Sequence, residues 1–553
     1  MRPARGEQHP HPLEPGSPSA PGRRDAGPHR GHPLRNRAAR VHLACRIRGR
    51  RSHFCGLDGH LRHGRPARED ALEPPRHPGP GRQEGSEGVI LKQFWNEQVQ
   101  QYSYLLGCPG AGEAIVIDAD RNVEQYIAAA AAERLRIVHV TETHIHADYL
   151  SGSRELAQRT GSNLWLSAEG GPDWQYTFTT PEHKPLRDGD TIQIGGVTVQ
   201  VWHTPGHTPE HISFLIHENG VLQGAMTGDF IFVGDVGRPD LLENAANMKG
   251  TAEPGARRLF QSVQRFAALP DHILIWPAHG AGSACGKSLG GVPVTTLGYE
   301  KATGWAWRIS DENKFVEEVL AGQPEPPFYF KMMKHLNKVG PDPRPAVDAL
   351  PRSSSLAEFE AARQRGAVVL DVRPSAMYLR EHIRGSLHIP IYAMFAQYVG
   401  WLVDFQEEVI LIASDEASAK QAATYMAYIG WDRATMWFGE DILRTYERAG
   451  HELVTTADLQ ACDVPKDAVW IDVRGRNERL GQNIPDAVGI TLGEMVVRKD
   501  EIPQGKRLAI SCQGGTRSPI GVSVAERLGH DVLNVRDGYL GFLTCQGRQK
   551  VSV

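Results

Sequence analysis

The sequence predicts a multidomain protein of the α/β class, and three observations support this prediction. From Val89 to about residue 350, short β-type runs alternate with helical ones. Beyond residue 350, one order of strands and helices occurs twice. The chain has 553 residues, 40% of them hydrophobic, which at about 150 residues per domain allows three or four well-filled cores.

Residues 1–88 differ from the rest of the chain. They are rich in Arg, Pro, Gly and His, contain no lysine and lack periodic apolar positions, so we expect disorder. Their prolines and glycines would break a targeting helix, and they lack the apolar core of a secretory signal. We expect the natural product to start near Val89, with translated upstream sequence before it. A transit peptide is the alternative.

Residues 89–350 form the first expected domain, in which hydrophobic periodicity predicts strands and helices in alternation. Strands are expected at 114–118, 136–141, 164–166, 191–194, 197–202, 221–226 and 273–276, and helices at 123–132 and 152–160.

Four polar fragments of this domain each follow a strand-like run. His144, His146 and Asp148 come after the run 137–140, and residues two apart in an extended chain project to the same side. The other fragments contribute His207, Asp229 and His279, after the runs 197–202, 221–226 and 273–276. Imidazole and carboxylate ligands suit zinc or ferrous iron. The sequence therefore predicts a metal centre at these strand ends.

The series of fragments resembles the motifs of the metallo-β-lactamase superfamily, whose first motif usually reads H-x-H-x-D-H. Here Tyr149 stands where the last histidine belongs. In dinuclear members that histidine serves the second metal, so the resemblance with this departure implies a single metal ion. The resemblance also implies an αββα sandwich for residues 89–350.

Two further side chains of this domain are candidates for the metal pocket. Arg238 follows Asp229 closely, and a guanidinium there could hold a substrate carboxylate or phosphate. The alternative is a loop arginine paired with Asp235 or Asp240. The thiol of Cys285 could also reach the pocket, with an inert buried thiol as the alternative.

The chain beyond a Pro- and Ser-rich linker at 340–355 contains an internal repeat. The stretch VVLDVR at 368–373 returns as VWIDVR at 469–474. Later elements correspond in the same order, strand 409–413 with 508–511 and helix 417–429 with 520–528. We therefore expect two copies of one α/β domain, at 351–450 and 451–553.

The copies differ in the loop between a strand and the following helix. In the second copy this loop reads Cys512, Gln513, Gly514, Gly515, Thr516 and Arg517. Successive backbone N–H groups, the helix N-terminus and the arginine of such a loop stabilise a thiolate or persulfide anion. The corresponding stretch 413–418 of the first copy has no thiol and two acids, so we expect it to be structural or to serve in docking.

The C-x-x-G-x-R loop with an upstream D-V-R strand resembles rhodanese sulfurtransferases, over about residues 455–545. The resemblance implies that Cys512 is the nucleophile, that Arg517 assists it and that residues 513–516 bind the substrate. A phosphatase loop would place five residues between cysteine and arginine, and here there are four. A structural cysteine is the alternative.

The whole arrangement after Val89 resembles the persulfide dioxygenase-rhodanese fusions of bacterial sulfide detoxification. The resemblance implies one ferrous ion per chain, in preference to zinc, with ligands His144, His207 and Asp229. The groups expected behind these ligands, orienting them and water, are His146, Asp148, Tyr149, His279 and Cys285.

The activity that this resemblance implies is the oxidation of a low-molecular-weight persulfide by dioxygen to sulfite. The carrier thiol would be glutathione, coenzyme A or a similar thiol, and Cys512 would transfer sulfur to form or use thiosulfate. Fusion would give the sulfite a high effective concentration at the second site. Two alternatives stay open: a zinc thioester hydrolase of the glyoxalase II type fused to a sulfurtransferase, and a non-catalytic sulfur carrier or sensor.

Composition limits the partners and the compartment. A formal net charge of −4 gives no general electrostatic reason to bind nucleic acid, and no apolar run is long enough to cross a membrane. The seven cysteines lack C-x-x-C pairs, so a reducing cytoplasm is expected. We also expect a homo-oligomer.

Overall fold

The computed structural model describes residues 88–178, 183–241, 243, 250–344 and 350–547. The extension expected at 1–88 therefore lies outside the described residues, apart from Gly88. Within the described ranges, no helix is both long and apolar enough to cross a membrane.

The first sheet of the N-terminal half contains β1 to β6 in chain order. Their bounds are β1 (Ile90–Asn96), β2 (Gln101–Cys108), β3 (Glu113–Ile117), β4 (Arg136–Thr141), β5 (Asn163–Ser167) and β6 (His183–Leu186). The strands β1 to β3 are antiparallel, and β3 to β6 are parallel.

The second sheet has the order β12-β11-β10-β9-β8-β7. Its strands are β7 (Thr191–Ile194), β8 (Val197–His203), β9 (Ile212–Glu218), β10 (Val221–Gly228), β11 (Leu274–Pro277) and β12 (Thr295–Thr296). All neighbours are antiparallel except β10 and β11. The loops that carry the predicted metal ligands therefore follow strands of both sheets.

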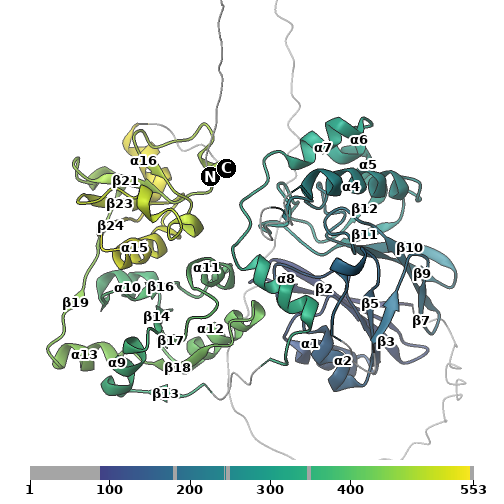
Figure 1. Ribbon diagram of the computed structural model, residues 1–553, viewed down its shortest axis with the longest axis horizontal. Coiled ribbons are helices and arrows are strands. Elements are labelled where there is room, and N and C mark those ends of the chain that lie inside the picture. Colours follow the sequence, from purple (N-terminus) through teal and green to yellow (C-terminus); the bar gives the residue numbers. More distant parts are fainter. Residues whose placement is uncertain (1–87, 179–182, 242, 244–249, 345–349, 548–553) are drawn as a thin grey trace, which may run out of the picture. The chain divides into compact units, whose positions relative to one another are not determined.

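The two sheets pack face to face, and helices cover their outer faces (Figure 1). Alternate residues of β2, β3, β8 and β9 fill the core between the sheets. The first sheet is covered by α1 (Val123–Ala132) and α2 (Ser153–Thr160), and the second by α4 (Ala252–Ala267) with α5 (Leu297–Thr303), α6 (Trp305–Arg308) and α7 (Glu312–Leu320). The αββα sandwich is thus confirmed.

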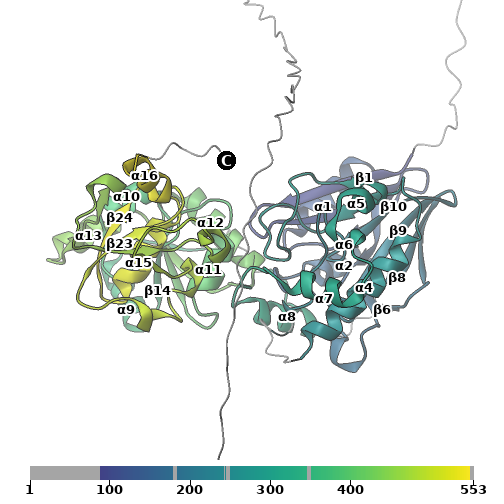
Figure 2. The same cartoon turned by 90° about the horizontal axis from the view of Figure 1, so that it is seen from above.

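The C-terminal half contains two five-stranded parallel sheets of the same topology (Figures 1 and 2). The first has the order β13 (Arg352–Ser353), β18 (Ala434–Phe438), β17 (Val409–Ile412), β14 (Val368–Asp371), β16 (Leu387–His388). The second has the order β20 (Ala457–Leu459), β24 (Asp531–Val535), β23 (Arg507–Ser511), β21 (Val469–Asp472), β22 (Val488–Gly489). The identical order confirms the predicted repeat.

Helices accompany the strands of both copies. The first copy has α9 (Leu356–Gln364), α10 (Ser375–Arg380), α11 (Phe395–Leu402), α12 (Glu416–Tyr428) and α13 (Asp441–Arg448), and the second has α14 (Arg476–Arg479), α15 (Ser518–Arg527) and α16 (Gly538–Cys545). A short antiparallel pair, β15 (His382–Ile383) and β19 (Leu453–Val454), joins the first copy to the connection that leads into the second.

One feature of the second copy was not anticipated from the sequence. Cys462 and Cys545 form a disulfide, with 5.5 Å between their Cα atoms. These residues are 83 positions apart, so no local spacing pattern announces the pair. This disulfide differs from what the expected reducing cytoplasm implies for the cysteines.

Candidate active site

His144, His207 and Asp229 converge at one end of the sandwich. Their ligand atoms lie within 4.8 Å of one another, and all three residues are buried. His207 Nε2 lies 3.5 Å and His144 Nε2 lies 4.0 Å from Asp229 Oδ2. The three residues that the family resemblance implies as metal ligands are therefore brought together from three separate loops.

Both histidines carry their proton on Nδ1, which leaves Nε2 free to bind a metal. His207 donates its Nδ1 hydrogen to the Arg238 carbonyl at 3.0 Å. The Thr143 hydroxyl donates to Asp118 Oδ2, so it accepts from His144 Nδ1, also at 3.0 Å. Such hydrogen bonds fix the tautomer in which Nε2 carries a lone pair.

The electrostatics of the triad favour neutral imidazoles beside an ionised carboxylate. Burial lowers the pKa of His144 well below its usual value and lowers the pKa of His207 to about 4. Burial alone would raise the pKa of Asp229, but neighbouring histidines, His279 first, hold it well below the usual range.

The triad contains buried polar atoms that are available to bind a metal. His144 Nε2 and both carboxylate oxygens of Asp229 are buried without a hydrogen-bond partner among the described residues. Each such atom costs about 1–3 kcal/mol if nothing binds it. Two imidazoles and one carboxylate are the donor set of non-haem ferrous sites, so these residues fit iron.

Behind the triad, Asp118 holds the loop that carries His144 and His146. Its Oδ1 accepts from Thr143 N at 2.7 Å and from His146 Nε2 at 3.0 Å. Burial alone would lower the pKa of His146, but the Asp118 carboxylate outweighs it and raises the pKa to about 9. The Tyr149 ring lies against the His146 ring at a tilt, and its hydroxyl donates to the Asp118 carbonyl. His146 and Tyr149 are thus engaged with Asp118.

A second cluster of polar side chains lies beside the triad. Asp148, His279 and Cys285 offer ligand atoms within 4.8 Å of one another. His279 Nε2 lies 3.2 Å from Asp229 Oδ1 and 3.4 Å from Asp148 Oδ2, while His279 Nδ1 donates to the Gln100 carbonyl at 2.7 Å. Burial raises the pKa of Cys285 to about 12, so this thiol stays protonated at neutral pH.

The helix α8 (Phe330–Val339) closes the same loop from outside the two sheets. Asn337 Nδ2 donates to the carbonyls of His146 and Tyr149 at 2.9 and 2.8 Å, and its Oδ1 accepts from Ser151 N at 2.9 Å. The Tyr329 hydroxyl, just before the helix, donates to the Asp148 carbonyl at 3.0 Å. Sequence reasoning did not find these residues because they lie more than 180 positions from the motif.

Arg238 is fully engaged in the protein. Its guanidinium donates to both carboxylate oxygens of Asp240 at 2.8 and 2.6 Å and to the Ala284 carbonyl at 2.9 Å, and only 1% of the residue is exposed. This geometry matches the alternative of a loop arginine paired with an aspartate.

The loop of the second copy places backbone donors around the sulfur of Cys512. The N–H groups of Gly515 and Arg517 donate to Sγ at 3.1 and 3.4 Å. Gly515 has φ +93, and a side chain there would collide with the Arg536 carbonyl, so glycine is required. Glu478 holds the Arg517 guanidinium through two bonds at 2.6 and 2.7 Å.

The other loop residues fill supporting roles. Gln513 Oε1 accepts from Arg474 at 3.2 Å. A Cβ atom added at Gly514 would make only an ordinary contact with Leu540, at 3.8 Å. In the first copy α12 begins three residues after Ala413, whereas α15 begins six residues after Cys512. The shorter loop cannot form the same cradle.

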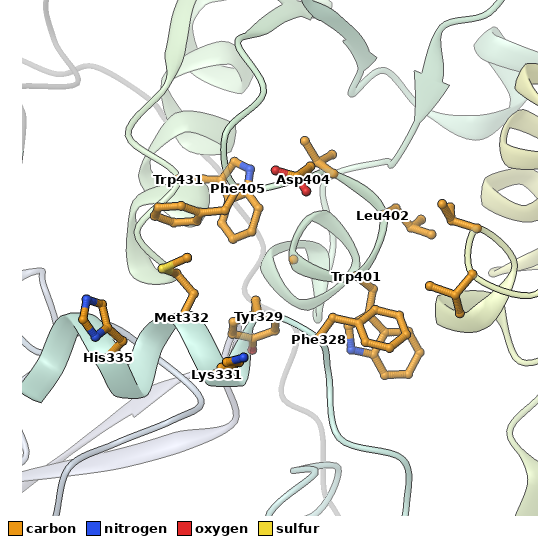
Figure 3. A pocket seen from close by; sticks show the side chains of 14 residues that line it. Phe328, Tyr329, Lys331, Met332, His335, Trp401, Leu402, Asp404, Phe405 and Trp431 are labelled. Atoms are coloured by element: carbon orange, nitrogen blue, oxygen red, sulfur yellow. The ribbon is translucent and has the colours of Figure 1, made fainter. Parts of the chain in front are cut away.

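An apolar cavity of about 520 Å³ lies elsewhere (Figure 3). Its walls come from the start of α8, from α11 and the loop after it, and from Trp431, Val496 and Val497. Phe328 and Trp401 lie on one side, and Met332, Phe405 and Trp431 on the other. The cavity contains none of the predicted site residues.

Comparison with protein families finds two matches. The metallo-beta-lactamase superfamily model matches residues 96–279, and the rhodanese-like domain model matches residues 355–438 and 456–545. These matches confirm both resemblances and the fold class expected from the sequence.

Individual proteins resemble parts of the chain. Persulfide dioxygenase ETHE1 of Bos taurus is 31% identical over 196 residues, which are 34% of this chain and 68% of that protein. Hydroxyacylglutathione hydrolase of Tolumonas auensis is 34% identical over 32% of this chain and 62% of its own length. A crystal structure of a metallo-beta-lactamase from Staphylococcus aureus is 37% identical, with a TM-score of 0.58 over 64% of this chain and 99% of that one.

Proposed function

Because the chain belongs to the metallo-β-lactamase superfamily and continues into two rhodanese-like domains, we propose that it oxidises a low-molecular-weight persulfide to sulfite and transfers sulfur through Cys512. One observation carries the proposal: a two-histidine, one-carboxylate triad and a sulfur-cradling cysteine loop occur in the same chain. A persulfide dioxygenase is among the relatives.

His144, His207 and Asp229 would hold the iron. When bound there, ferrous iron would supply the capacity to bind a thiolate sulfur and to activate dioxygen. Release of sulfite requires water to lose a proton, which the carboxylate of Asp148, 3.4 Å from His279, would take. Thr143 and Asp118 keep the His144 ring oriented.

Cys512 would act by nucleophilic transfer. Its thiolate attacks the terminal sulfur of a persulfide, the sulfur–sulfur bond breaks, and the carrier thiol leaves. Sulfite then attacks that sulfur, which forms thiosulfate and returns the thiolate. The N–H groups of Gly515 and Arg517 stabilise the anion before and after each step. The reverse direction uses the same groups.

The rival function, thioester hydrolysis, is favoured by the hydroxyacylglutathione hydrolase relative. Tyr149 at the end of the first motif speaks against it, because the phenol lies on His146 and Asp118 and adds no ligand for a second metal. Release of thiol from S-lactoylglutathione by the purified chain, without oxygen consumption, would support hydrolysis.

The sulfur-transfer half is tested by the products formed from glutathione persulfide. The wild-type chain should form thiosulfate above a protein-free control. Cys512→Ser should form sulfite at the wild-type rate and no thiosulfate above that control, while Cys108→Ser, which changes a thiol elsewhere, should behave as wild type. Wild-type thiosulfate yield from Cys512→Ser would contradict the role of this cysteine.

A further inference from the structure

The disulfide between Cys462 and Cys545 joins two elements of the second copy. Cys462 lies in the short helix η3 (Ala461–Asp463), and Cys545 is the last residue of α16. Neither residue belongs to the metal triad or to the Cys512 loop, so the proposed chemistry does not use this bond. Cys462 is exposed and Cys545 is half-buried. The bond therefore lies at the surface, within reach of a small thiolate.

The opposite end of α16 holds the Cys512 loop. The N–H groups of Tyr539 and Leu540 donate to the carbonyls of Cys512 and Gln513 at 2.8 and 3.1 Å. A side chain at Gly538 would collide with the Cys512 carbonyl, so the backbones of the helix and the loop are in close contact there. The helix thus connects the disulfide at its last residue to the nucleophile loop at its first turn.

A side chain of α16 gives the loop a second support. The Arg474 guanidinium lies over the Tyr539 ring, 4.0 Å from its centroid, and donates to Gln513 Oε1 at 3.2 Å. Tyr539 is only 5% exposed, so its ring is fixed by packing. The helix α16 therefore supports both the backbone and the side chain of Gln513, the residue that follows the nucleophile.

The disulfide restrains a helix that needs tertiary contacts. The helix α16 has eight residues, and a helix of this length is not stable by itself. Its other contacts include the bond from Ala461 N to Asp537 Oδ1, at 2.8 Å, and the contact between the Phe542 and Trp470 rings. The crosslinked cysteines are 83 positions apart, and a crosslink across so long a segment removes much chain entropy from the open state. Opening the bond should therefore loosen α16.

We propose that the disulfide between Cys462 and Cys545 is a thiol-sensitive switch of sulfur transfer at Cys512. The thiolate of a low-molecular-weight thiol attacks the Cys462 sulfur, the disulfide bond breaks, and Cys545 leaves as a thiolate. A second thiolate attacks the small-molecule sulfur of this mixed disulfide, and Cys462 leaves as a thiolate. The two small thiols are thereby oxidised to their disulfide and the protein bond is reduced.

The reverse reaction closes the switch, with a low-molecular-weight disulfide as the oxidant. In the open form α16 holds the Cys512 loop less firmly, and sulfur transfer slows. The carrier thiol that persulfide oxidation would release is a reductant of the required class. This inference rests on the proposed role of Cys512.

Reduction and reoxidation of the wild-type full chain test the switch. The chain is reduced with dithiothreitol and desalted without oxygen, and half of it is reoxidised with glutathione disulfide. Thiocyanate formation from thiosulfate and cyanide measures transfer at Cys512. We expect the reduced form to be about 10-fold slower, because the nucleophile loop loses its positioning, and reoxidation to restore the rate. Hydrogen exchange of residues 538–545 should be faster in the reduced form.

Single variants separate this bond from the other thiols. Cys462→Ser cannot close the bond, so it should transfer sulfur at the rate of the reduced wild type throughout the same cycle. Cys108→Ser keeps the bond and should follow the wild type. A wild-type rate that does not depend on reduction, or a Cys462→Ser rate that changes with it, would overturn the switch. Free thiols at Cys462 and Cys545 after reoxidation would also overturn it.

Failure of the proposed function would have a different signature. A wild-type chain that forms no thiocyanate in either state would contradict transfer at Cys512, and hydrogen exchange alone would then test the link between the disulfide and the loop. Faster exchange of residues 538–545 after reduction would support this link, and unchanged exchange would overturn it.

Discussion

Single hydrogen bonds decide which nitrogen of each ligand histidine is free. Thr143 is the residue that makes this choice for His144, since its hydroxyl donates to Asp118 and must accept from Nδ1. The motif letters contain the histidines but not this arrangement. A residue next to a ligand therefore controls metal binding without touching the metal.

Replacing the hydroxyl of Thr143 should weaken iron binding. Thr143→Val removes the acceptor for His144 Nδ1, so the imidazole can adopt the wrong tautomer, and metal affinity should fall about 10- to 100-fold. Competition with a chelator measures the iron retained. Thr141→Val, which loses a hydroxyl bonded to the Trp165 carbonyl, is the control. Equal iron retention by both variants would refute the role of Thr143.

At the residue scale, the sequence predicted three side chains that the structure brings together, but not the residues that support them. Six candidate residues, His144, His207 and Asp229 among them, were predicted because each lies just after a strand-like run, and the family resemblance implied these three as ligands. Asp118 and Asn337 were missed because an isolated acid or amide carries no spacing signal. Their importance comes from contacts that only the folded chain makes.

At the scale of elements, α8 acts as a cover on the metal loop. Its residue Asn337 takes three buried backbone partners, the carbonyls of His146 and Tyr149 and the N–H of Ser151. The amide thus replaces the backbone pairing that the loop lacks. The apolar periodicity of α8 is typical of an amphipathic helix, but it does not show on which surface the helix packs.

Asn337→Ala should destabilise the metallo-β-lactamase domain. The change leaves two carbonyls and one N–H without partners in a buried place, which costs about 2–4 kcal/mol in the free energy of unfolding. Urea unfolding followed by fluorescence measures the loss. His335→Ala, an exposed position of the same helix, should change stability by less than about 0.5 kcal/mol. Similar values for the two variants would exclude the proposed anchoring.

The helix α15, which follows the Cys512 loop, is held by the first copy. Glu526 accepts from His382 Nε2 at 3.0 Å, and the Ser523 hydroxyl accepts from His388 N at 2.9 Å. The copy without a thiol therefore contacts and supports the copy that carries Cys512.

Glu526→Gln should reveal a pH-dependent contribution to stability. Burial alone would raise the pKa of Glu526, but the His382 contact outweighs it and lowers the pKa below its unfolded value of 4.5. The carboxylate therefore stabilises the fold above pH 4.5, and this contribution disappears as the pH falls through the folded pKa. Wild type should exceed the variant by about 1–2 kcal/mol at pH 7 and match it near pH 3. A difference that does not depend on pH would contradict this assignment.

At the scale of the whole molecule, Arg121 joins the metallo-β-lactamase domain to the first rhodanese-like copy. Its guanidinium donates to both oxygens of Asp432 at 2.8 and 2.9 Å and to the carbonyls of Ala427 and Asp342, each at 3.0 Å. Only 2% of this side chain is exposed. The contact keeps the two kinds of domain in one arrangement.

Arg121→Met should loosen that arrangement. The change leaves one carboxylate and two carbonyls without their donor, at a cost of about 2–4 kcal/mol. Calorimetry should show one thermal transition for the wild type and two for the variant. Arg159→Met, which removes an exposed pair with Glu124, should leave one transition. A single unshifted transition in the Arg121 variant would contradict the role of Arg121 in joining the two domains.

The order of domains was readable from the sequence, whereas their contacts were not. The repeat at 368–373 and 469–474 predicted two copies because buried strands keep their apolar pattern. The Arg121 contact and the pair Cys462 and Cys545 join residues hundreds or tens of positions apart, and no local pattern encodes such pairs. Long-range polar contacts therefore needed the structure.

The proposed function depends on a mononuclear iron centre that consumes dioxygen with a persulfide. The most direct measurement combines iron content with oxygen uptake by the anaerobically prepared full chain after addition of glutathione persulfide. We expect about one iron per chain, as a triad of this kind binds one ion, and one dioxygen consumed per sulfite formed, with both lost in Asp229→Ala. Zinc in the centre, with no oxygen uptake, would contradict the account.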